Sequence, residues 1–176
     1  MQQELLSLND KLSKCKLFVM DVDGTLTDGS LYYGVNGEEL KRFYVRDGMG
    51  IVLLHKAGIK TAILTSDNSK IVLSRGQKLG IDEIILGSRN KTKDFNTLLK
   101  KLNIESDEAV FIGDDLNDKH LMEKVHFSVC PHDAIPQIRN IADYICSASG
   151  GNGAVREICE LILIARKIGV KLDEDW

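Results

Sequence analysis

The sequence predicts an α/β fold, in which a doubly wound parallel sheet carries helices on both faces. Short apolar runs rich in branched residues alternate along the chain with segments of helical spacing. Several of these runs end abruptly in polar residues, as buried strands do where they leave a sheet. With 176 residues, 43% of them hydrophobic, the chain can build one core of this kind, so we expect a single domain over residues 1–176.

The expected elements follow one another in a regular order. A β-hairpin at about 31–45 is predicted because Asn36 and Gly37 supply the positive φ angles of a tight turn. It comes directly after the first strand and is the only insertion that we expect. The other elements are strands at 16–22, 60–65, 82–87, 109–113, 126–130 and 143–146, and helices at 48–57, before Gly80, around 95–102, up to Lys124, at 133–141 and at 153–167.

Residue spacing and glycine positions support the helices. Gly58 and Gly80 are residues of the kind that end a helix. Phe95, Leu98, Leu99 and Leu102 stand at i, i+3, i+4 and i+7, which places them on one face. The last helix is apolar on most sides, so we expect it to be buried or to lie at a subunit interface.

Composition excludes several classes of protein. The net charge is −3, aromatic residues make up 6% of the chain and there is no long basic run, so a nucleic-acid partner is not expected. The four cysteines lie far apart without a CxxC pair, which favours free thiols in a reducing compartment. The first fourteen residues are too polar for a signal peptide, and no segment has the apolar length of a membrane span. We therefore expect a cytoplasmic protein without a membrane partner.

Polar residues gather where the predicted strands end, and ligands of doubly wound sheets bind beyond the carboxyl ends of the strands. Turn and capping preferences explain any one of these residues, but not a cluster of acids at two strand ends with hydroxyl groups and a lysine at others. The residues concerned are Asp21, Asp23, Thr65, Ser66, Lys91, Asp114, Asp115 and Asp118.

This set of side chains predicts phosphoryl chemistry. Clustered carboxylates repel one another and require a cation, and oxygen ligands with a phosphate suit Mg²⁺. One carboxylate can act as a nucleophile that forms an acyl phosphate, and a second can protonate the leaving oxygen and then activate water. A lysine and a hydroxyl group can hold the phosphoryl oxygens. The combination describes a phosphohydrolase.

The motif DVDGTLTDG at 21–29 resembles the nucleophile motif of the haloacid dehalogenase superfamily, and ILT, SRNKT and GDDLND follow in the family's order. The resemblance implies a Rossmann-like fold of haloacid dehalogenase type and an aspartyl-phosphate intermediate. It implies that Asp21 is the nucleophile, that Asp23 is the general acid and base, and that Thr65 and Lys91 bind the phosphoryl group. It further implies Mg²⁺ held by Asp21, the carbonyl oxygen of Asp23 and Asp114, with Asp115 and Asp118 as supporting partners.

From about Lys16 to Lys167 the chain resembles the 3-deoxy-D-manno-octulosonate 8-phosphate (KDO 8-phosphate) phosphatase family, through its hairpin in place of a large cap domain and the stretches GEELKRFYVRDGMGI and GGNGAVREICELIL. The resemblance implies hydrolysis of that compound in lipopolysaccharide biosynthesis by a homotetramer whose neighbouring subunits complete each site. Arg46 and Arg75 are then the cations expected at the sugar-acid end. The implied substrate-binding residues are Asp23, Tyr44, Val45, Arg46, Asp47, Gly48, Arg75 and Lys91.

The chain departs from the family pattern after Thr65, where Ser66 and Asp67 stand in place of the usual Gly-Arg. An acid that faces a substrate carboxylate is unfavourable unless a base pairs with it. Asp67 therefore motivates an alternative with the same chemistry, a phosphatase of a nine-carbon 2-keto-3-deoxy sugar-acid 9-phosphate.

Two further classes compete with an enzyme. Related domains serve as non-catalytic oligomerisation modules, but this chain keeps Asp21, Asp23, Lys91 and Asp114. A phosphoacceptor receiver domain also places aspartates and a lysine at strand ends, but Asp23 and the hairpin speak against it.

The segment at about 168–176 is expected to be a tail, which in the family can reach a neighbouring site.

Overall fold

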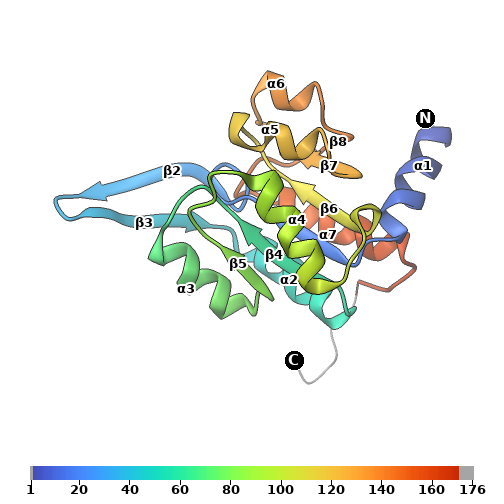
Figure 1. The fold of residues 1–176 in the computed structure, drawn as a ribbon, viewed down its shortest axis with the longest axis horizontal. Coiled ribbons are helices and arrows are strands. Elements are labelled where there is room, and N and C mark those ends of the chain that lie inside the picture. Colours follow the sequence, from blue (N-terminus) through green and yellow to red (C-terminus); the bar gives the residue numbers. More distant parts are fainter. Residues whose placement is uncertain (1, 171–176) are drawn as a thin grey trace.

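The doubly wound parallel sheet is confirmed by the computed structural model, which describes residues 2–170 (Figure 1). The six strands of the main sheet run parallel in the order β5-β4-β1-β6-β7-β8, and β2 and β3 form a separate antiparallel hairpin. The strands are β1 (Leu17–Met20), β2 (Thr27–Gly34), β3 (Gly37–Phe43), β4 (Lys60–Leu64), β5 (Glu83–Ile85), β6 (Ala109–Ile112), β7 (Phe127–Cys130) and β8 (Tyr144–Ile145).

Helices cover both faces of the sheet because the side chains of a strand alternate between its faces. In β1, Phe18 and Met20 join the core beneath α1, α2, α3 and α7, while Leu17 and Val19 join the core beneath α4, α5 and α6. All four side chains are fully buried. The helices are α1 (Gln2–Ser13), α2 (Val45–Lys56), α3 (Lys70–Leu79), α4 (Lys91–Leu102), α5 (Leu116–Met122), α6 (Pro136–Arg139) and α7 (Ala154–Ala165), with a 3₁₀ turn at Ser106–Glu108.

Three helices differ from the sequence prediction. Helix α1 was not expected, and its last turn places Leu12 in the core. Helix α2 begins at Val45 rather than Gly48. Helix α6 has four residues instead of nine, because Pro136 stands in its first turn and forces the preceding residue, Ile135, into an extended conformation.

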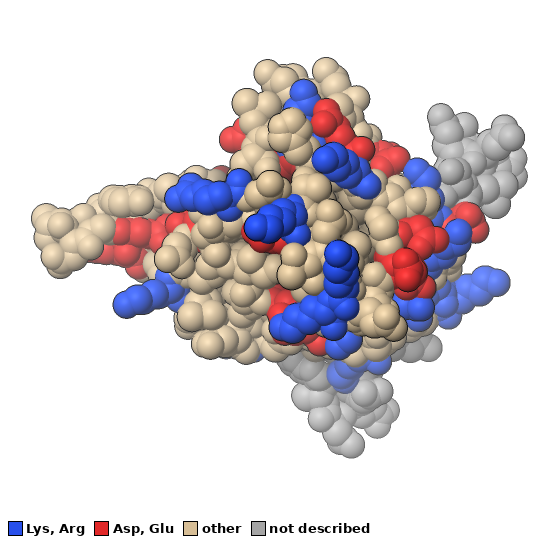
Figure 2. Space-filling view, viewed as in Figure 1, with Lys and Arg blue, Asp and Glu red and all other residues tan. Residues whose placement is uncertain are grey.

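The hairpin extends away from the body of the molecule, at the left of Figure 1. It begins at Thr27, four residues before the predicted start, and ends at Phe43. Its outer part is apolar and open to solvent, since Tyr33 is 70% and Val35 is 100% exposed. On the face shown in Figure 2 its outer end carries no charged side chain, whereas acidic side chains gather nearer the body.

Other expectations concern the thiols and the chain ends. The four cysteines are buried and unpaired, as expected for free thiols. Among the helices of residues 2–170, none has both the length and the apolar character that a bilayer span requires. Of the tail expected at 168–176, residues 171–176 lie outside the described part of the chain.

Candidate active site

The sheet order places a crevice at the carboxyl end of β1. In the sheet, β4 lies on one side of β1 and β6 on the other. The chain passes from β1 toward β4 and from β6 toward β7, so the connections that follow β1 and β6 diverge. Met20 is paired with both Ile63 and Ile112, so the three strands end at nearly the same level. Asp21, Thr65 and Asp114 therefore lie next to one another.

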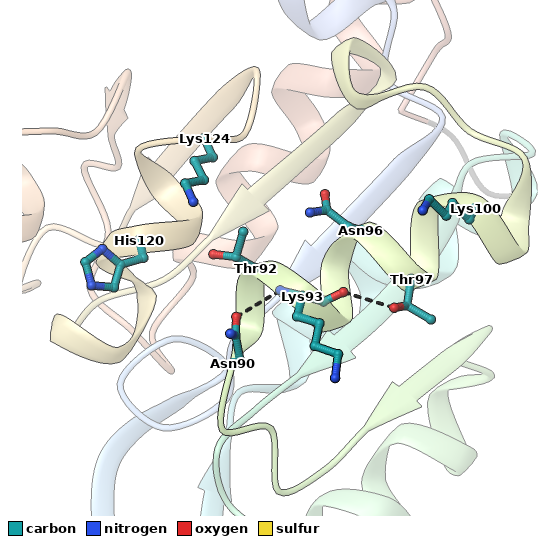
Figure 3. A pocket seen from close by; sticks show the side chains of 8 residues that line it. All are labelled: Asn90, Thr92, Lys93, Asn96, Thr97, Lys100, His120 and Lys124. Atoms are coloured by element: carbon teal, nitrogen blue, oxygen red, sulfur yellow. Dashed lines mark hydrogen bonds between the residues drawn. The ribbon is translucent and has the colours of Figure 1, made fainter.

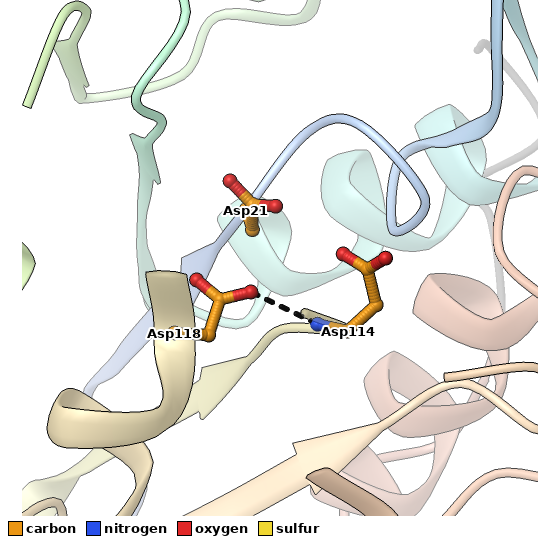
Figure 4. A group of neighbouring side chains, drawn as sticks. All are labelled: Asp21, Asp114 and Asp118. Atoms are coloured by element: carbon orange, nitrogen blue, oxygen red, sulfur yellow. Dashed lines mark hydrogen bonds between the residues drawn. The ribbon is translucent and has the colours of Figure 1, made fainter. Parts of the chain in front are cut away.

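Three aspartates meet in this crevice, as Figure 4 shows. Carboxylate oxygens of Asp21, Asp114 and Asp118 lie within 4.8 Å of one another. Asp118 is fixed by the start of α5: its Oδ2 accepts the backbone N–H of Asp114 at 2.9 Å and that of Asp115 at 3.4 Å. Asp115 is the N-cap of α5 and Asp118 closes the capping box, so the local helix start positions both acids.

Lys91 joins two of the three acids. It is the first residue of α4, and its Nζ lies 2.6 Å from Oδ1 of Asp21 and 2.5 Å from Oδ1 of Asp118. Lys91 is 4% exposed and Asp21 is 3% exposed. Burial lowers the pKa of Lys91, but the charges of Asp21 and Asp118 outweigh this effect, so its pKa is raised and the side chain is positively charged.

The pKa values of the acids reflect an excess of negative charge. Burial and then the charge of Asp118 raise the pKa of Asp21 to about 7, against the lowering effect of Lys91. Burial and the charges of Asp21, Asp118 and Asp115 raise the pKa of Asp114 to about 8. One lysine thus faces three carboxylates. This donor set fits a divalent cation with oxygen ligands, and such an ion would favour the ionised form of both acids.

The loop after β1 packs tightly against Asp114. Gly24 has φ +81°, and a β-carbon at this position would collide with the Asp114 carboxylate. The hydroxyl group of Thr25 donates to Oδ1 of Asp114 at 3.3 Å. On the other side, Gly150 leaves no room for a side chain against the carbonyl oxygen of Gly24. The GGNG segment therefore shapes the loop that carries Asp23.

A cavity of about 500 Å³ reaches this cluster at Asp21 and extends to the base of the hairpin. Thr65, which is 2% exposed, lines it, and the hydroxyl oxygen of Thr65 accepts the backbone N–H of Asp67 at 3.1 Å. The cavity brings together Asp21, Asp23, Leu31, Tyr33, Glu38, Lys41, Thr65, Ser66, Asp67, Asp115, Leu116 and Asn117.

Lys41 is a cavity residue that the sequence did not single out. Its side chain is fully buried, and its Nζ contacts Oδ1 of Asp23 at 2.5 Å, Oε1 of Glu38 at 2.9 Å and Oδ2 of Asp67 at 3.0 Å. Burial lowers the pKa of Lys41, but hydrogen bonds to the three acids raise it above its ordinary value. The base that Asp67 requires is therefore Lys41 of the same chain.

Residues 44–48 and Arg75, which are expected to contact the sugar-acid end of the substrate, do not line this cavity. Tyr44 is the N-cap of α2, and the guanidinium group of Arg46 lies 6.0 Å from its ring centre. Asp47 is 1% exposed and accepts the backbone N–H of Arg156 at 2.8 Å. Arg75 stacks over Phe43 at 5.7 Å and lines a separate hollow beside α3. Val45 is 78% exposed, and Gly48 is buried in α2.

A second hollow of about 600 Å³ lies on the outer surface between α4 and α5 (Figure 3). Three lysines and His120 line it, but Lys93 and Lys124 point in different directions. The acid cluster is not part of this hollow. The smaller cavity over Asp21 is therefore the candidate active site.

A buried lysine that joins the acid after β1 to an acid in the first turn of α5, beside an open cavity, defines a hydrolase of the haloacid dehalogenase type. The model of the haloacid dehalogenase-like hydrolase family matches residues 55–158 of this chain. The 3-deoxy-D-manno-octulosonate 8-phosphate phosphatase of Escherichia coli (strain K12) is 46% identical over 164 residues, which cover 93% of this chain and 86% of that protein. The counterpart from Yersinia pestis is 40% identical over 156 residues, covering 89% of this chain and 83% of that protein.

Solved structures of phosphatases with the same function as these relatives are also similar to this chain. The phosphatase of the same name from Moraxella catarrhalis, in complex with magnesium, phosphate and KDO, has a TM-score of 0.89 and 43% identity, and covers 92% of each chain. The cobalt-bound enzyme from Haemophilus influenzae has a TM-score of 0.87 and 38% identity, covering 89% of this chain and 92% of that chain. The chain belongs to the family of KDO 8-phosphate phosphatases within the haloacid dehalogenase-like hydrolases, as its motifs indicated.

Proposed function

We propose that this protein hydrolyses 3-deoxy-D-manno-octulosonate 8-phosphate to KDO and phosphate, with Mg²⁺ as cofactor. The observation that carries this proposal is the buried contact of Lys91 with Asp21, 2.6 Å long, where Asp21 lines an open cavity. Family membership supplies the substrate class, since the relatives that cover most of the chain are phosphatases of this compound.

Asp21 is the nucleophile in the proposed reaction. Its carboxylate attacks phosphorus, an aspartyl phosphate forms, and the sugar-acid oxygen leaves. Asp23 gives its proton to that oxygen and then takes a proton from the water that attacks the intermediate. Lys91 and the hydroxyl group of Thr65 hold the phosphoryl oxygens, where negative charge is redistributed during transfer.

The residues proposed to hold Mg²⁺ are Asp21, the carbonyl oxygen of Asp23 and Asp114. Asp118 is the third acid of the cluster, but its two oxygens already accept hydrogen bonds from Lys91 and from the backbone N–H of Asp114, before α5. Asp118 thus orients Lys91 and the loop at Asp114. When bound, Mg²⁺ neutralises charge on the transferred phosphoryl group.

We also propose that the protein works as a homotetramer in which the hairpin of one copy packs on a second copy and completes its site. Leu31, Tyr33, Val35 and Leu40 are 49–100% exposed, so a monomer would leave the apolar side chains of the hairpin in water. Tyr44, Val45, Arg46, Asp47 and Gly48, together with Arg75, would then serve the sugar-acid end of a site that the single chain leaves open. Replacing Val35 and Tyr33 by lysine should give a monomer in light scattering, whereas an unchanged mass would contradict the assembly.

A nine-carbon 2-keto-3-deoxy sugar-acid 9-phosphate is the second candidate substrate, and Asp67 favours it. One carboxylate oxygen of Asp67 is paired with Lys41, so the side chain can accept hydrogen bonds from substrate hydroxyl groups without an unpaired charge. The two substrates are separated by their kcat/KM values with Mg²⁺. A tenfold preference for the eight-carbon compound supports the first proposal, and the reverse preference supports the second.

We further propose that the chain is one domain and that it acts in the cytoplasm. The main sheet spans the described residues from Leu17 to Ile145, and α1 and α7 pack on the same face of it. Four buried free thiols are typical of proteins from a thiol-reducing compartment.

A further inference from the structure

Lys41 connects three segments of the molecule at one point. It lies on β3 at the base of the hairpin, and its ammonium group contacts carboxylates from the loop after β1, from β3 itself and from the loop after β4. An ammonium group has three N–H donors, so all of them are used. The side chain is fully buried, whereas that of Asp23 is 34% exposed toward the cavity.

The other two partners of Lys41 are themselves fixed to the body of the protein. Oε2 of Glu38 accepts the hydroxyl group of Ser69 at 2.5 Å, and Ser69 caps α3 through the backbone N–H of Ile71. Oδ1 of Asp67 accepts the backbone N–H of Asn68 at 2.7 Å. The ammonium group is therefore held at a defined place, and a group held in this way can fix a third partner.

We propose that Lys41 is a positioning residue, which holds one carboxylate oxygen of Asp23 and leaves the other free to meet the leaving oxygen of the phosphate ester. This inference rests on the proposed function, in which Asp23 supplies a proton to that oxygen. A carboxylate on a loop can rotate about two side-chain bonds, and a misplacement of 1 Å at a reacting group can cost about 10²-fold in rate. The hairpin thereby contributes to the chemistry as well as to the cavity wall.

If Lys41 only stabilised the base of the hairpin, its replacement would lower activity on every phosphate ester by the same factor. Arg42 has such a stabilising role, because its guanidinium group donates to Asp28 at 2.9 Å and to Asn152 at 3.1 Å on the outer side of the same strand. It does not contact Asp23. Arg42 therefore offers a matched control one residue away.

The test compares two phosphate esters whose leaving groups differ. A sugar-acid phosphate releases an alcohol, which needs a proton, whereas p-nitrophenyl phosphate releases a stable anion, which does not. We expect Lys41→Met to lose at least about tenfold more kcat/KM on KDO 8-phosphate than on p-nitrophenyl phosphate. We compare kcat/KM because it reports the steps up to departure of the leaving group, and not the later attack of water, which both esters share. Arg42→Met should lose activity on both esters by the same factor.

Equal losses of Lys41→Met on both esters, with an active wild type, would overturn the role of Lys41 and leave the proposed function standing. If Lys41→Met does not fold, the comparison is made with Lys41→Arg, whose planar guanidinium group cannot place a donor where the Lys41 Nζ lies. Equal losses of activity by Lys41→Arg on both esters would overturn the positioning role as well. A wild type inactive on both esters overturns the proposed function, and the role of Lys41 with it.

Discussion

Replacement of Lys91 by methionine should destabilise the fold strongly. The methionine side chain is similar in length to that of lysine, but it lacks the charge that two buried carboxylates share. The Nζ of Lys91 lies 2.6 Å from Oδ1 of Asp21 and 2.5 Å from Oδ1 of Asp118. Their side chains are 4% and 0% exposed, so water cannot replace the lost partner. Breaking a buried pair by removing one partner costs about 3–5 kcal/mol.

The cost of the Lys91 replacement can be measured by urea or thermal unfolding without Mg²⁺. In a domain of this size, each kcal/mol lowers the melting temperature by about 2–4 °C, so we expect a decrease of about 6–20 °C. Lys93→Met is the matched control, because Lys93 lies on the same helix but is exposed. The control should change the free energy of unfolding by less than about 0.5 kcal/mol.

Activity provides a second measurement on the same pair of variants. Loss of an electrostatic contact to the transferring group lowers kcat by about 10²–10³-fold, so Lys91→Met should be nearly inactive while Lys93→Met remains active. A free energy of unfolding of Lys91→Met within about 1 kcal/mol of the wild-type value would show that the buried carboxylates of Asp21 and Asp118 do not depend on Lys91 for their stability.

Further predictions concern three aspartates. Asp23→Asn should lower turnover by about 10²–10⁴-fold in phosphate-release assays, while calorimetry shows Mg²⁺ binding retained, because the proposed ligand is a backbone carbonyl. Asp114→Asn should lose most of the stabilisation that Mg²⁺ gives the wild type, about 2.7 kcal/mol at one hundred times the dissociation constant; equal stabilisation of both proteins would contradict its role as a ligand. Burial raises the pKa of Asp47 from 3.8 to about 6, so the folded state binds this proton more tightly than the unfolded state, and wild-type stability falls as pH rises through that window. The stability of Asp47→Asn relative to wild type should therefore increase by about 2 kcal/mol between pH 4 and pH 7, and a constant difference in urea unfolding would argue against the shift.

The main sheet and the centre of the site could be predicted from sequence because both depend on local signals. Each buried strand is a short apolar run, and Asp21, Thr65 and Asp114 directly follow such runs or the glycine after them. Once the strands are parallel, their carboxyl ends must meet. Lys91 follows from its motif, which places it at the first position of α4.

Lys41 could not be predicted in the same way. It stands among charged residues of a hairpin strand, where alternation alone does not show which side faces the body. Its partner Asp23 is 18 residues away, and the contact depends on how the hairpin leaves the sheet. Helix α1 was missed because its polar residues hide its apolar positions, of which Leu12 reaches the core.

The contacts of Arg46 and Arg75 could not be inferred from their motif either. Both guanidinium groups stack on aromatic rings of their own chain, outside the cavity over Asp21. A role in substrate binding would depend on a second copy of the chain, and no sequence pattern within one copy gives that geometry.

The main proposal is that Asp21 carries out the hydrolysis of a sugar-acid phosphate. Its most direct test is phosphate release from KDO 8-phosphate with Mg²⁺, measured for the wild type and for Asp21→Asn. We expect a wild-type kcat/KM of at least about 10⁴ M⁻¹s⁻¹ and no release by Asp21→Asn above the background without enzyme. Release by Asp21→Asn at a rate close to that of the wild type would contradict the role of Asp21 as nucleophile.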